Sequence, residues 1–209
     1  MGATKELALI NLLVSNDVDV LFVTEAELEP EAAACFAVRD YVTFLPPITL
    51  EGQKVRVLAL VKSVAAIMFD AKLRVDLCTT LAIWLEFSLP KRSLFGGVYR
   101  PWSGLAVERL QLEALLDRSA AATAEASVVV LTGDLNLDVS RVDDKGYHRH
   151  SLLTKLLSDL TEAGLEYIPT GPTWVSHGTF QGFHRTSTID HTYVFGASVT
   201  VTVLPDSTS

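Results

Sequence analysis

The sequence is poor in cysteine and contains no long apolar stretch. Its two cysteines, Cys35 and Cys78, stand alone, so neither a disulfide framework nor a cysteine metal site is predicted, and a reducing intracellular setting is expected. No apolar run approaches the roughly 18 residues that a membrane-spanning helix requires. Lys5 and Glu6 interrupt the start of the chain, and no secretory signal peptide or membrane partner is expected.

Basic residues are also scarce. The 17 Lys and Arg against 25 Asp and Glu leave a net charge of −8. Nucleic-acid-binding domains usually carry a basic stripe, so this charge argues mildly against strong non-specific DNA binding, although a local basic face remains compatible with it. The chain is 49% hydrophobic and 20% charged, which is typical of a globular protein. Its 209 residues predict one domain, 1–209, with a large core.

Apolar strand patterns alternate with amphipathic helical patterns along the chain. The many strands with few helices between them predict an α/β sandwich, with sheets in the middle and helices outside. Residues 64–69 and 73–77 are apolar and ambiguous, and the Gly/Pro/Thr/His-rich stretch 169–188 is expected to be a long irregular segment. Helices are predicted over 4–15, 105–125 and 151–163, and strands over 18–25, 38–45, 54–62, 80–87, 94–99, 128–134, 189–195 and 198–204.

The clearest candidate site follows an uninterrupted apolar run that begins at Val128. This run ends in Thr-Gly-Asp-Leu-Asn, so Asp134 and Asn136 lie two residues apart and point the same way in an extended chain. A turn is the ordinary alternative for an isolated Asp-x-Asn. A calcium loop is excluded, because Val139 replaces the required glycine and Lys145 the required glutamate.

Other predicted strands also end in polar residues. Convergence of such strand ends at one edge of a sandwich would collect carboxylates, an amide, a phenol and a guanidinium. Mg²⁺ prefers hard oxygen ligands and commonly takes only one or two protein carboxylates, while Arg and Tyr donate to phosphate. The residues concerned are Glu25, Tyr99, Arg100, Asp134, Asn136, Ser187 and Asp190.

The order of these motifs resembles that of the endonuclease/exonuclease/phosphatase superfamily. More narrowly, it resembles the apurinic-type endonuclease domain of non-LTR retrotransposons, and the likeness spans nearly the whole chain. It rests on Val-Thr-Glu25, Val98-Tyr99-Arg100-Pro101, Gly133-Asp134-Leu135-Asn136, Thr173-Trp174 and Ser187-Thr188-Ile189-Asp190-His191.

This resemblance implies a four-layer α/β sandwich, two packed β-sheets flanked by helices, and metal-dependent phosphodiester cleavage. By position, Glu25 is similar to the metal-binding glutamate and Tyr99 to the tyrosine that contacts the scissile phosphate. Asp134 resembles the aspartate that positions or deprotonates the attacking water, and Asn136 the asparagine that holds the phosphate and this aspartate. Asp190 resembles the aspartate that orients the late catalytic histidine. Arg100, Thr173, Trp174 and Ser187 are then candidates for substrate binding.

The chain departs from the family pattern at both ends. The family's first strand, with its active-site asparagine, precedes the helix at which this chain starts, and the family's final Ser-Asp-His does not appear before Ser209. Edge strands are therefore expected to be missing, and activity to be weakened or lost. His191 does not match the late histidine. Its expected role is a strand residue partly buried near the site, with replacement of that histidine as the alternative.

The function expected from the resemblance is target-site nicking of DNA by a retroelement endonuclease. Mg²⁺ is the expected cofactor, with Mn²⁺ as a substitute. DNA and a reverse transcriptase domain of the full-length protein are the expected partners, and the nucleus is the expected location. One alternative is a phosphatase or phosphodiesterase of the same superfamily that acts on lipid or inositol phosphates. Another is a catalytically dead DNA-binding or interaction module.

Overall fold

The computed structural model describes residues 3–47, 54–79, 81–102, 104–180 and 183–203. The chain forms two compact units, of which the first ends at Tyr99 and the second begins at Arg100. The single domain expected over residues 1–209 stays a prediction. Within the described ranges, no helix has both the length and the apolar character needed to cross a membrane.

The first unit contains two antiparallel sheets and three helices. The first sheet has the order β1-β3-β2, and the second includes the order β4-β5-β6. Their bounds are β1 Val20–Leu28, β2 Tyr41–Phe44, β3 Val55–Lys62, β4 Ala71–Leu73, β5 Ala82–Phe87 and β6 Ser93–Tyr99, with α1 Ala3–Ser15, α2 Pro30–Ala34 and α3 Ser63–Met68.

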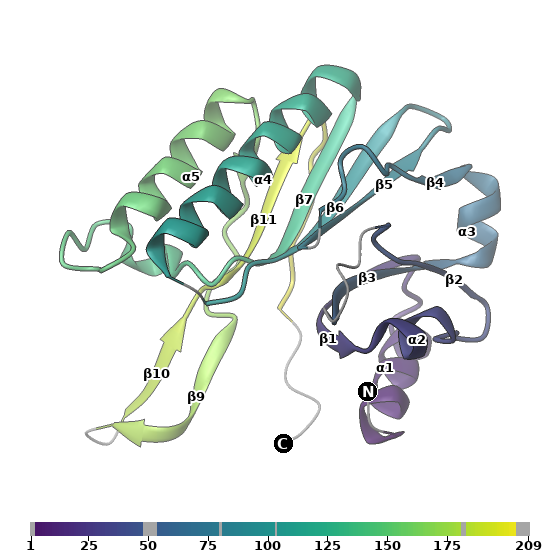
Figure 1. Ribbon diagram of the computed structural model, residues 1–209, viewed down its shortest axis with the longest axis horizontal. Helices are drawn as coiled ribbons and strands as arrows, with labels where there is room; N and C mark the ends of the chain where they lie inside the picture. The colour runs from purple at the N-terminus through teal and green to yellow at the C-terminus, as the bar shows by residue number, and fades with distance from the viewer. Residues whose placement is uncertain (1–2, 48–53, 80, 103, 181–182, 204–209) are drawn as a thin grey trace. The chain divides into compact units, whose positions relative to one another are not determined.

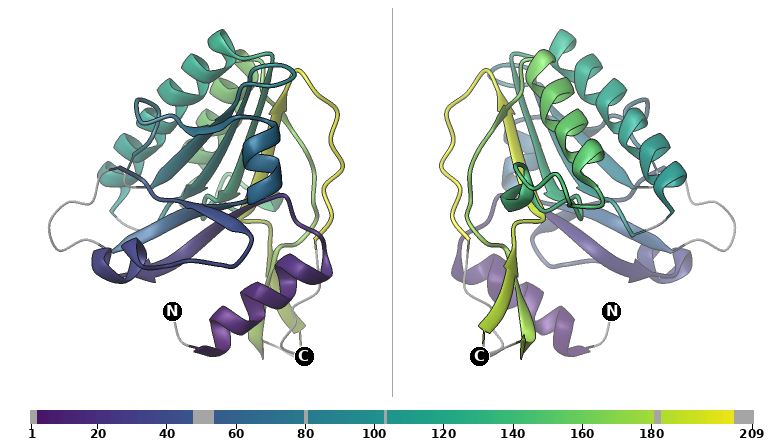
Figure 2. Two further views of the ribbon diagram at one scale, coloured as in Figure 1. Left: turned by 90° about the vertical axis from the view of Figure 1, so that its right-hand side faces the viewer. Right: turned by 90° about the vertical axis from the view of Figure 1, so that its left-hand side faces the viewer.

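Strand β3 is buried on both faces, because layers cover it from two sides. Leu58 and Leu60 belong to one apolar cluster with Leu13 of α1, and Figure 2 shows α1 in purple beside the β1-β3-β2 sheet. The residues of β3 that alternate with these point to the opposite face of the sheet. On that face, β3 packs on β5 and β6. The first unit is therefore layered as helix, sheet and sheet.

The two sheets of the first unit meet tightly at Gly97 of β6. A Cβ atom added to Gly97 would lie 2.2 Å from Phe22 Cδ1 of β1, far inside van der Waals contact. The absence of a side chain at this position lets the phenyl ring of Phe22 fill the space between the sheets.

The second unit consists of helices packed on an antiparallel sheet, with a separate hairpin. The sheet includes the order β7-β11-β8, and Figure 1 shows α4 and α5 side by side over β7 and β11. The bounds are α4 Leu105–Glu125, β7 Val128–Asp134, a 3₁₀ turn η1 Val139–Arg141, α5 His150–Glu162, β8 Glu166–Tyr167, β9 Trp174–Phe180, β10 Phe183–Ser187 and β11 Asp190–Phe195.

The predicted helices are confirmed within one residue at each end. The leucine face of α5 is buried as expected, through Leu152, Leu153, Leu156 and Leu160, because this face lies against the sheet. The ambiguous stretch 64–69 is largely the short helix α3, and 73–77 is mostly turn after β4.

Two predictions for the C-terminal part were wrong. The stretch 169–188 is not irregular, since β9 and β10 pair there as an antiparallel hairpin, which Figure 1 shows extending beyond the ends of α4 and α5. The predicted strand 198–204 is not found in its described part, residues 198–203. Strand β11 pairs instead with β7 and β8, so its hydrogen-bonding edges are already occupied.

We predict that Gly97→Ala destabilises the protein by about 1–3 kcal/mol, because the new methyl group overpacks the Phe22 contact. Urea unfolding followed by circular dichroism measures the change. Gly146→Ala is the control: its nearest neighbour is a flexible carboxylate oxygen at 3.2 Å, so a change within about 0.5 kcal/mol is expected. Equal stability of wild type and Gly97→Ala would contradict the tight contact.

Candidate functional site

In the first unit, two predicted site residues are hydrogen-bonded to each other. The hydroxyl of Tyr99, the last residue of β6, donates to Glu25 Oε1 at 2.8 Å. Tyr99 is buried, whereas Glu25 is exposed. The arrangement therefore presents a carboxylate at the surface and fixes its direction from below.

A bulge in β1 is what turns Glu25 outward. Three residues of β1, between Thr24 and Leu28, stand opposite a single residue of β3. Glu25 and Glu27 both have left-handed backbone conformations, with φ of 51° and 49°, which cost on the order of 1 kcal/mol or more for each such residue. Bulges of this kind re-aim side chains and are over-represented beside active sites.

In the second unit, Asn136 holds the carboxylate of Asp134. Asp134 ends β7 and is nearly buried. Its Oδ1 accepts the backbone N–H of Asn136 at 2.8 Å, and its Oδ2 accepts Nδ2 of the same residue at 3.2 Å. This closure requires a tight turn, in which Asn136 takes a φ of 49°. Both oxygens are thus oriented by one neighbour.

The orientation of the Asn136 amide is fixed by three partners. Nδ2 donates to Asp134 Oδ2 and also to the Arg100 carbonyl at 2.9 Å, while Oδ1 accepts Nε1 of Trp102 at 2.6 Å. A flipped amide would place its oxygen against two acceptors and its nitrogen against an N–H donor. Only one orientation of the amide therefore satisfies all three contacts.

Asp190 stands directly across from Asp134. The two aspartates are register partners on the antiparallel strands β11 and β7, so both side chains project from the same face of the sheet. Thr173 fixes the entry into β11, because its hydroxyl accepts the backbone N–H groups of Ile189 and Asp190, each at 3.1 Å. The prediction that these strand ends bring Asp134, Asn136 and Asp190 to one place agrees with this register.

The other substrate-binding candidates lie at the base of the hairpin. The backbone N–H of Thr173 donates to the Ser187 carbonyl at 3.0 Å, and Trp174 is the register partner of Ser187. Trp174 is 42% exposed. Thr173 therefore acts on the fold through its hydroxyl, whereas Trp174 offers an accessible ring.

Arg100 is placed differently from the prediction that it binds a phosphate. It is only 3% exposed. Its Nε donates to the Leu135 carbonyl at 2.7 Å and one terminal nitrogen to the Asn136 carbonyl at 3.1 Å. The guanidinium therefore supports the backbone of the Asp134–Asn136 turn from inside. Burial lowers the pKa of Arg100, and the adjacent Glu108 carboxylate opposes that shift.

Glu108 of α4 was not predicted and is the counter-ion of two arginines. It is completely buried, lies 3.3 Å from Arg100 and accepts two hydrogen bonds from Arg149, at 2.8 and 2.7 Å. Asp138 was also not predicted. It caps the 3₁₀ turn η1 by accepting the backbone N–H of Ser140 at 3.2 Å, and it accepts the backbone N–H of Thr188 at 3.0 Å. Asp138-x-Ser140 was a usable signal for such a cap, whereas the pairing of Glu108 gave no sequence signal.

His191 lies in the interior, with both ring nitrogens engaged. Nδ1 is 2.8 Å from the Tyr193 hydroxyl and Nε2 is 2.7 Å from the Leu137 carbonyl. Burial lowers the pKa of His191 to about 4. These contacts fit the structural role better than replacement of a catalytic histidine.

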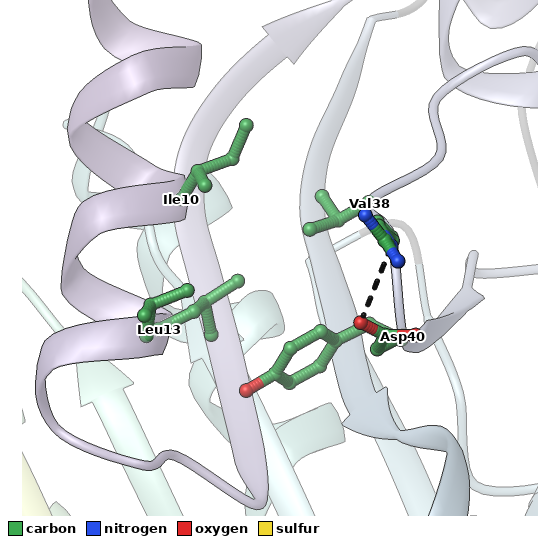
Figure 3. Close-up of a pocket in the computed structure, with 7 residues that line it drawn as sticks. Ile10, Leu13, Val38 and Asp40 are labelled. Carbon is green, nitrogen blue, oxygen red and sulfur yellow. Dashed lines mark ion pairs between the residues drawn. The ribbon is translucent and has the colours of Figure 1, made fainter.

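A separate pocket lies in the first unit, between α1 and the segment before β2. It has a volume of about 260 Å³ and is lined mainly by apolar side chains. Figure 3 shows Ile10 and Leu13 of α1 across from Val38. None of the candidate site residues lines it.

The donor chemistry within each unit suits a hard cation. In the second unit, Asp134 and Asp190 supply carboxylate oxygens, which Mg²⁺ prefers. In the first unit, Glu25 supplies a group of the same kind. Across the described part of the chain, no three His, Cys, Asp or Glu side chains form a preformed metal cluster, and Mg²⁺ commonly keeps several water ligands.

We predict that Glu108→Gln destabilises the second unit by about 3–5 kcal/mol, because two arginines lose the charge that compensates their burial. Urea unfolding measures the loss. Glu113→Gln, on an exposed position of the same helix, should change stability by no more than about 0.5 kcal/mol. Similar small effects of both variants would show that the buried pairing contributes little.

His191 predicts a pH dependence of stability. His191 has a pKa of 6.5 in the unfolded chain, and burial lowers this pKa to about 4 in the folded chain. The stability that is present above pH 6.5 is therefore lost as the pH falls towards 4, by on the order of 3 kcal/mol. Urea unfolding between pH 7 and 4.5 should give a flatter profile for His191→Gln than for wild type. His150→Gln is the matched control, and parallel profiles for wild type and His191→Gln would refute the prediction.

Comparison with known proteins places this chain in a family. The model of the Endonuclease/Exonuclease/phosphatase family matches residues 2–208. No curated protein matches the sequence.

Solved structures share the fold. The endonuclease domain of TRAS1, a telomere-specific non-LTR retrotransposon, has 17% identity and a TM-score of 0.66, over 92% of this chain and 79% of that one. The 3′ phosphatase NExo from Neisseria, bound to a product DNA hairpin, has 19% identity and a TM-score of 0.66, over 92% and 82%. The AP endonuclease LMAP from Leishmania major has 14% identity and a TM-score of 0.65, over 90% and 73%.

These likenesses confirm the predicted α/β fold class and the resemblance on which it was based. The family match carries the assignment further than the individual structures, because it extends over nearly the whole sequence. The protein belongs to the endonuclease/exonuclease/phosphatase family.

Proposed function

We propose that this protein is a Mg²⁺-dependent endonuclease that nicks DNA, as the target-site nuclease of a retroelement. The observation that carries the proposal is the Asp134 carboxylate, which Asn136 holds through both oxygens at the end of a buried strand. Asp190 stands opposite on the neighbouring strand. Acidic groups oriented in this way are what the activation of a water molecule requires.

In the proposed reaction, Asp134 orients the attacking water and accepts its proton. The water oxygen bonds to phosphorus, the bond from phosphorus to the 3′ oxygen breaks, and that oxygen leaves as a hydroxyl once protonated. The products are a 5′-phosphate and a 3′-hydroxyl. Because Asn136 already fixes the carboxylate, little reorganisation is needed when the water arrives.

Glu25 and Tyr99 are proposed to serve the metal and the phosphate. Glu25 offers an exposed carboxylate for Mg²⁺, or for Mn²⁺ in its place. When bound, the ion would neutralise charge that develops on the phosphoryl oxygens. Tyr99 orients Glu25 through its hydroxyl at 2.8 Å, and this hydroxyl is also a donor of the kind that contacts a phosphate.

The residues at the hairpin base are proposed to act on the DNA side. Trp174 supplies an exposed ring, and the Thr173 hydroxyl ties the hairpin base to β11. The hydrogen bond from the Thr173 N–H to the Ser187 carbonyl closes that base. Arg100 acts through the backbone of the Asp134–Asn136 turn rather than on phosphate. His191 receives no catalytic step, because both its nitrogens are engaged inside the unit.

The retroelement role is the finer part of the proposal. It is supported by the motif order and by the fold likeness to the TRAS1 endonuclease domain. DNA as the substrate is supported by the product DNA hairpin bound in the similar structure of NExo from Neisseria. A reverse transcriptase domain as partner and a nuclear location follow from this role, since a 3′-hydroxyl would serve as its primer.

We predict that the protein nicks supercoiled plasmid with Mg²⁺, and that Asp134→Ala slows nicking by about 10²–10⁴-fold, the usual effect of losing a positioned acid–base group. Gel conversion of supercoiled to open-circular plasmid measures the rate, with EDTA as the metal-free arm. Asp143→Ala, an exposed aspartate in the following loop, should nick like wild type.

Further outcomes separate the alternatives. Extension of the nick by a DNA polymerase would support release of a 3′-hydroxyl. Phosphate release from inositol phosphates without nicking would favour the phosphatase branch of the family. Folded protein that neither nicks nor releases phosphate would overturn the hydrolase proposal and favour a DNA-binding module.

A further inference from the structure

Trp102 connects the surface of the second unit to the Asp134 turn. Its ring is 59% exposed, yet its indole N–H donates to Asn136 Oδ1 at 2.6 Å. A large aromatic side chain at the surface gains little from burial. Specific contacts must therefore hold the Trp102 ring in one orientation. The hydrogen bond to Asn136 is the first of these contacts.

A buried ion pair supplies the second contact. The guanidinium of Arg149 lies 3.9 Å from the centroid of the Trp102 ring, within the range of a cation–π interaction. Arg149 is itself immobilised by two hydrogen bonds to Glu108. The indole is therefore held on its face by a fixed cation and at its edge by the Asn136 amide.

These contacts form one chain that ends at the reacting group. Glu108 fixes Arg149, Arg149 fixes the ring of Trp102, and the indole N–H fixes the oxygen of the Asn136 amide. With that oxygen held, the opposite end of the amide points its nitrogen at Asp134 Oδ2 and at the Arg100 carbonyl. Loss of the indole donor would leave Oδ1 without its protein partner and remove one of the three contacts that fix the amide.

We infer that Trp102 is a positioning residue, which locks the Asn136 amide and, through it, the carboxylate of Asp134. The effect of this role on rate rests on the proposed hydrolysis, whereas the geometry of the Trp102 contacts does not. Trp102 acts through Asn136 and is assigned no contact with the scissile bond. Groups that orient a reacting or metal-binding side chain typically contribute about 10–100-fold to activity.

The geometric part is tested without any substrate. In ¹⁵N-labelled protein, the indole N–H signal of Trp102, assigned with Trp102→Phe, should show slow exchange with solvent and should shift in Asn136→Ala. The signal of Trp174, which is also partly exposed, is the internal reference and should stay unchanged. The inference would be overturned if the Trp102 indole N–H exchanged as fast as that of free tryptophan, or if its signal did not shift in Asn136→Ala. Either outcome holds whether or not the protein cleaves DNA.

The kinetic part uses Trp102→Phe, which keeps an aromatic ring for Arg149 but removes the N–H donor together with part of the indole ring. Plasmid nicking should show kcat lower by about 10-fold or more with KM changed less than about 2-fold, because orientation rather than binding is lost. Phe69→Leu, which removes a partly exposed aromatic ring from the first unit, is the control and should leave both constants unchanged.

A double-mutant comparison identifies the route. In an Asn136→Ala background, adding Trp102→Phe should cost less than about 2-fold further, since the amide through which Trp102 acts is already gone. Full additivity of the two losses, or a change in KM alone, would overturn the positioning role. A wild-type protein that does not nick DNA would count against the proposed function, and the indole measurement would then decide the inference separately.

Discussion

In the second unit, the carboxylate of Glu108 has no exposed surface and faces the guanidinium groups of Arg100 and Arg149. Burying three charges is costly, and such a group is stable only when its geometry and hydrogen bonding are good. Arg100 meets this condition by donating to carbonyls of the Asp134–Asn136 turn, and Arg149 by two hydrogen bonds to Glu108. Helix α4, the start of α5 and the end of β7 are therefore held by one cluster, and the position of the candidate site depends on it.

The sequence predicted the parts of the site that depend on local pattern. A buried apolar run followed by Asp134-x-Asn136 defines both a strand and its polar end, and the structure has both. Helices α4 and α5 were equally accessible, because a leucine stripe at a helical period specifies a buried face. On α1, by contrast, Leu7, Ile10 and Val14 share a face that is exposed. The resemblance to a known family added expected roles for Glu25, Tyr99 and Asp190, which composition alone leaves open.

What the sequence could not supply depends on contacts between distant residues. Arg100 was expected to bind substrate, and only the position of Glu108 on α4 shows why it is buried. The hairpin β9–β10 was missed, because the Gly and Pro residues of the stretch 169–188 suggest an irregular segment, while the pairing of Ser187 with Trp174 is non-local. Residues 198–203 have a strand-like composition, but β11 already has partners on both edges.

The bulge that presents Glu25 also constrains how β1 could change in length. It places two more residues on β1 than on β3 between the paired positions Thr24–Val57 and Leu28–Val55. An even excess leaves the alternation of the strand intact, so Ala26 and Leu28 stay buried while Glu25 and Glu27 stay exposed. Insertion or deletion of a single residue there would exchange the two faces and turn glutamates into the core. Natural variants of this segment should therefore differ in length by pairs of residues, a pattern that an alignment of relatives would reveal.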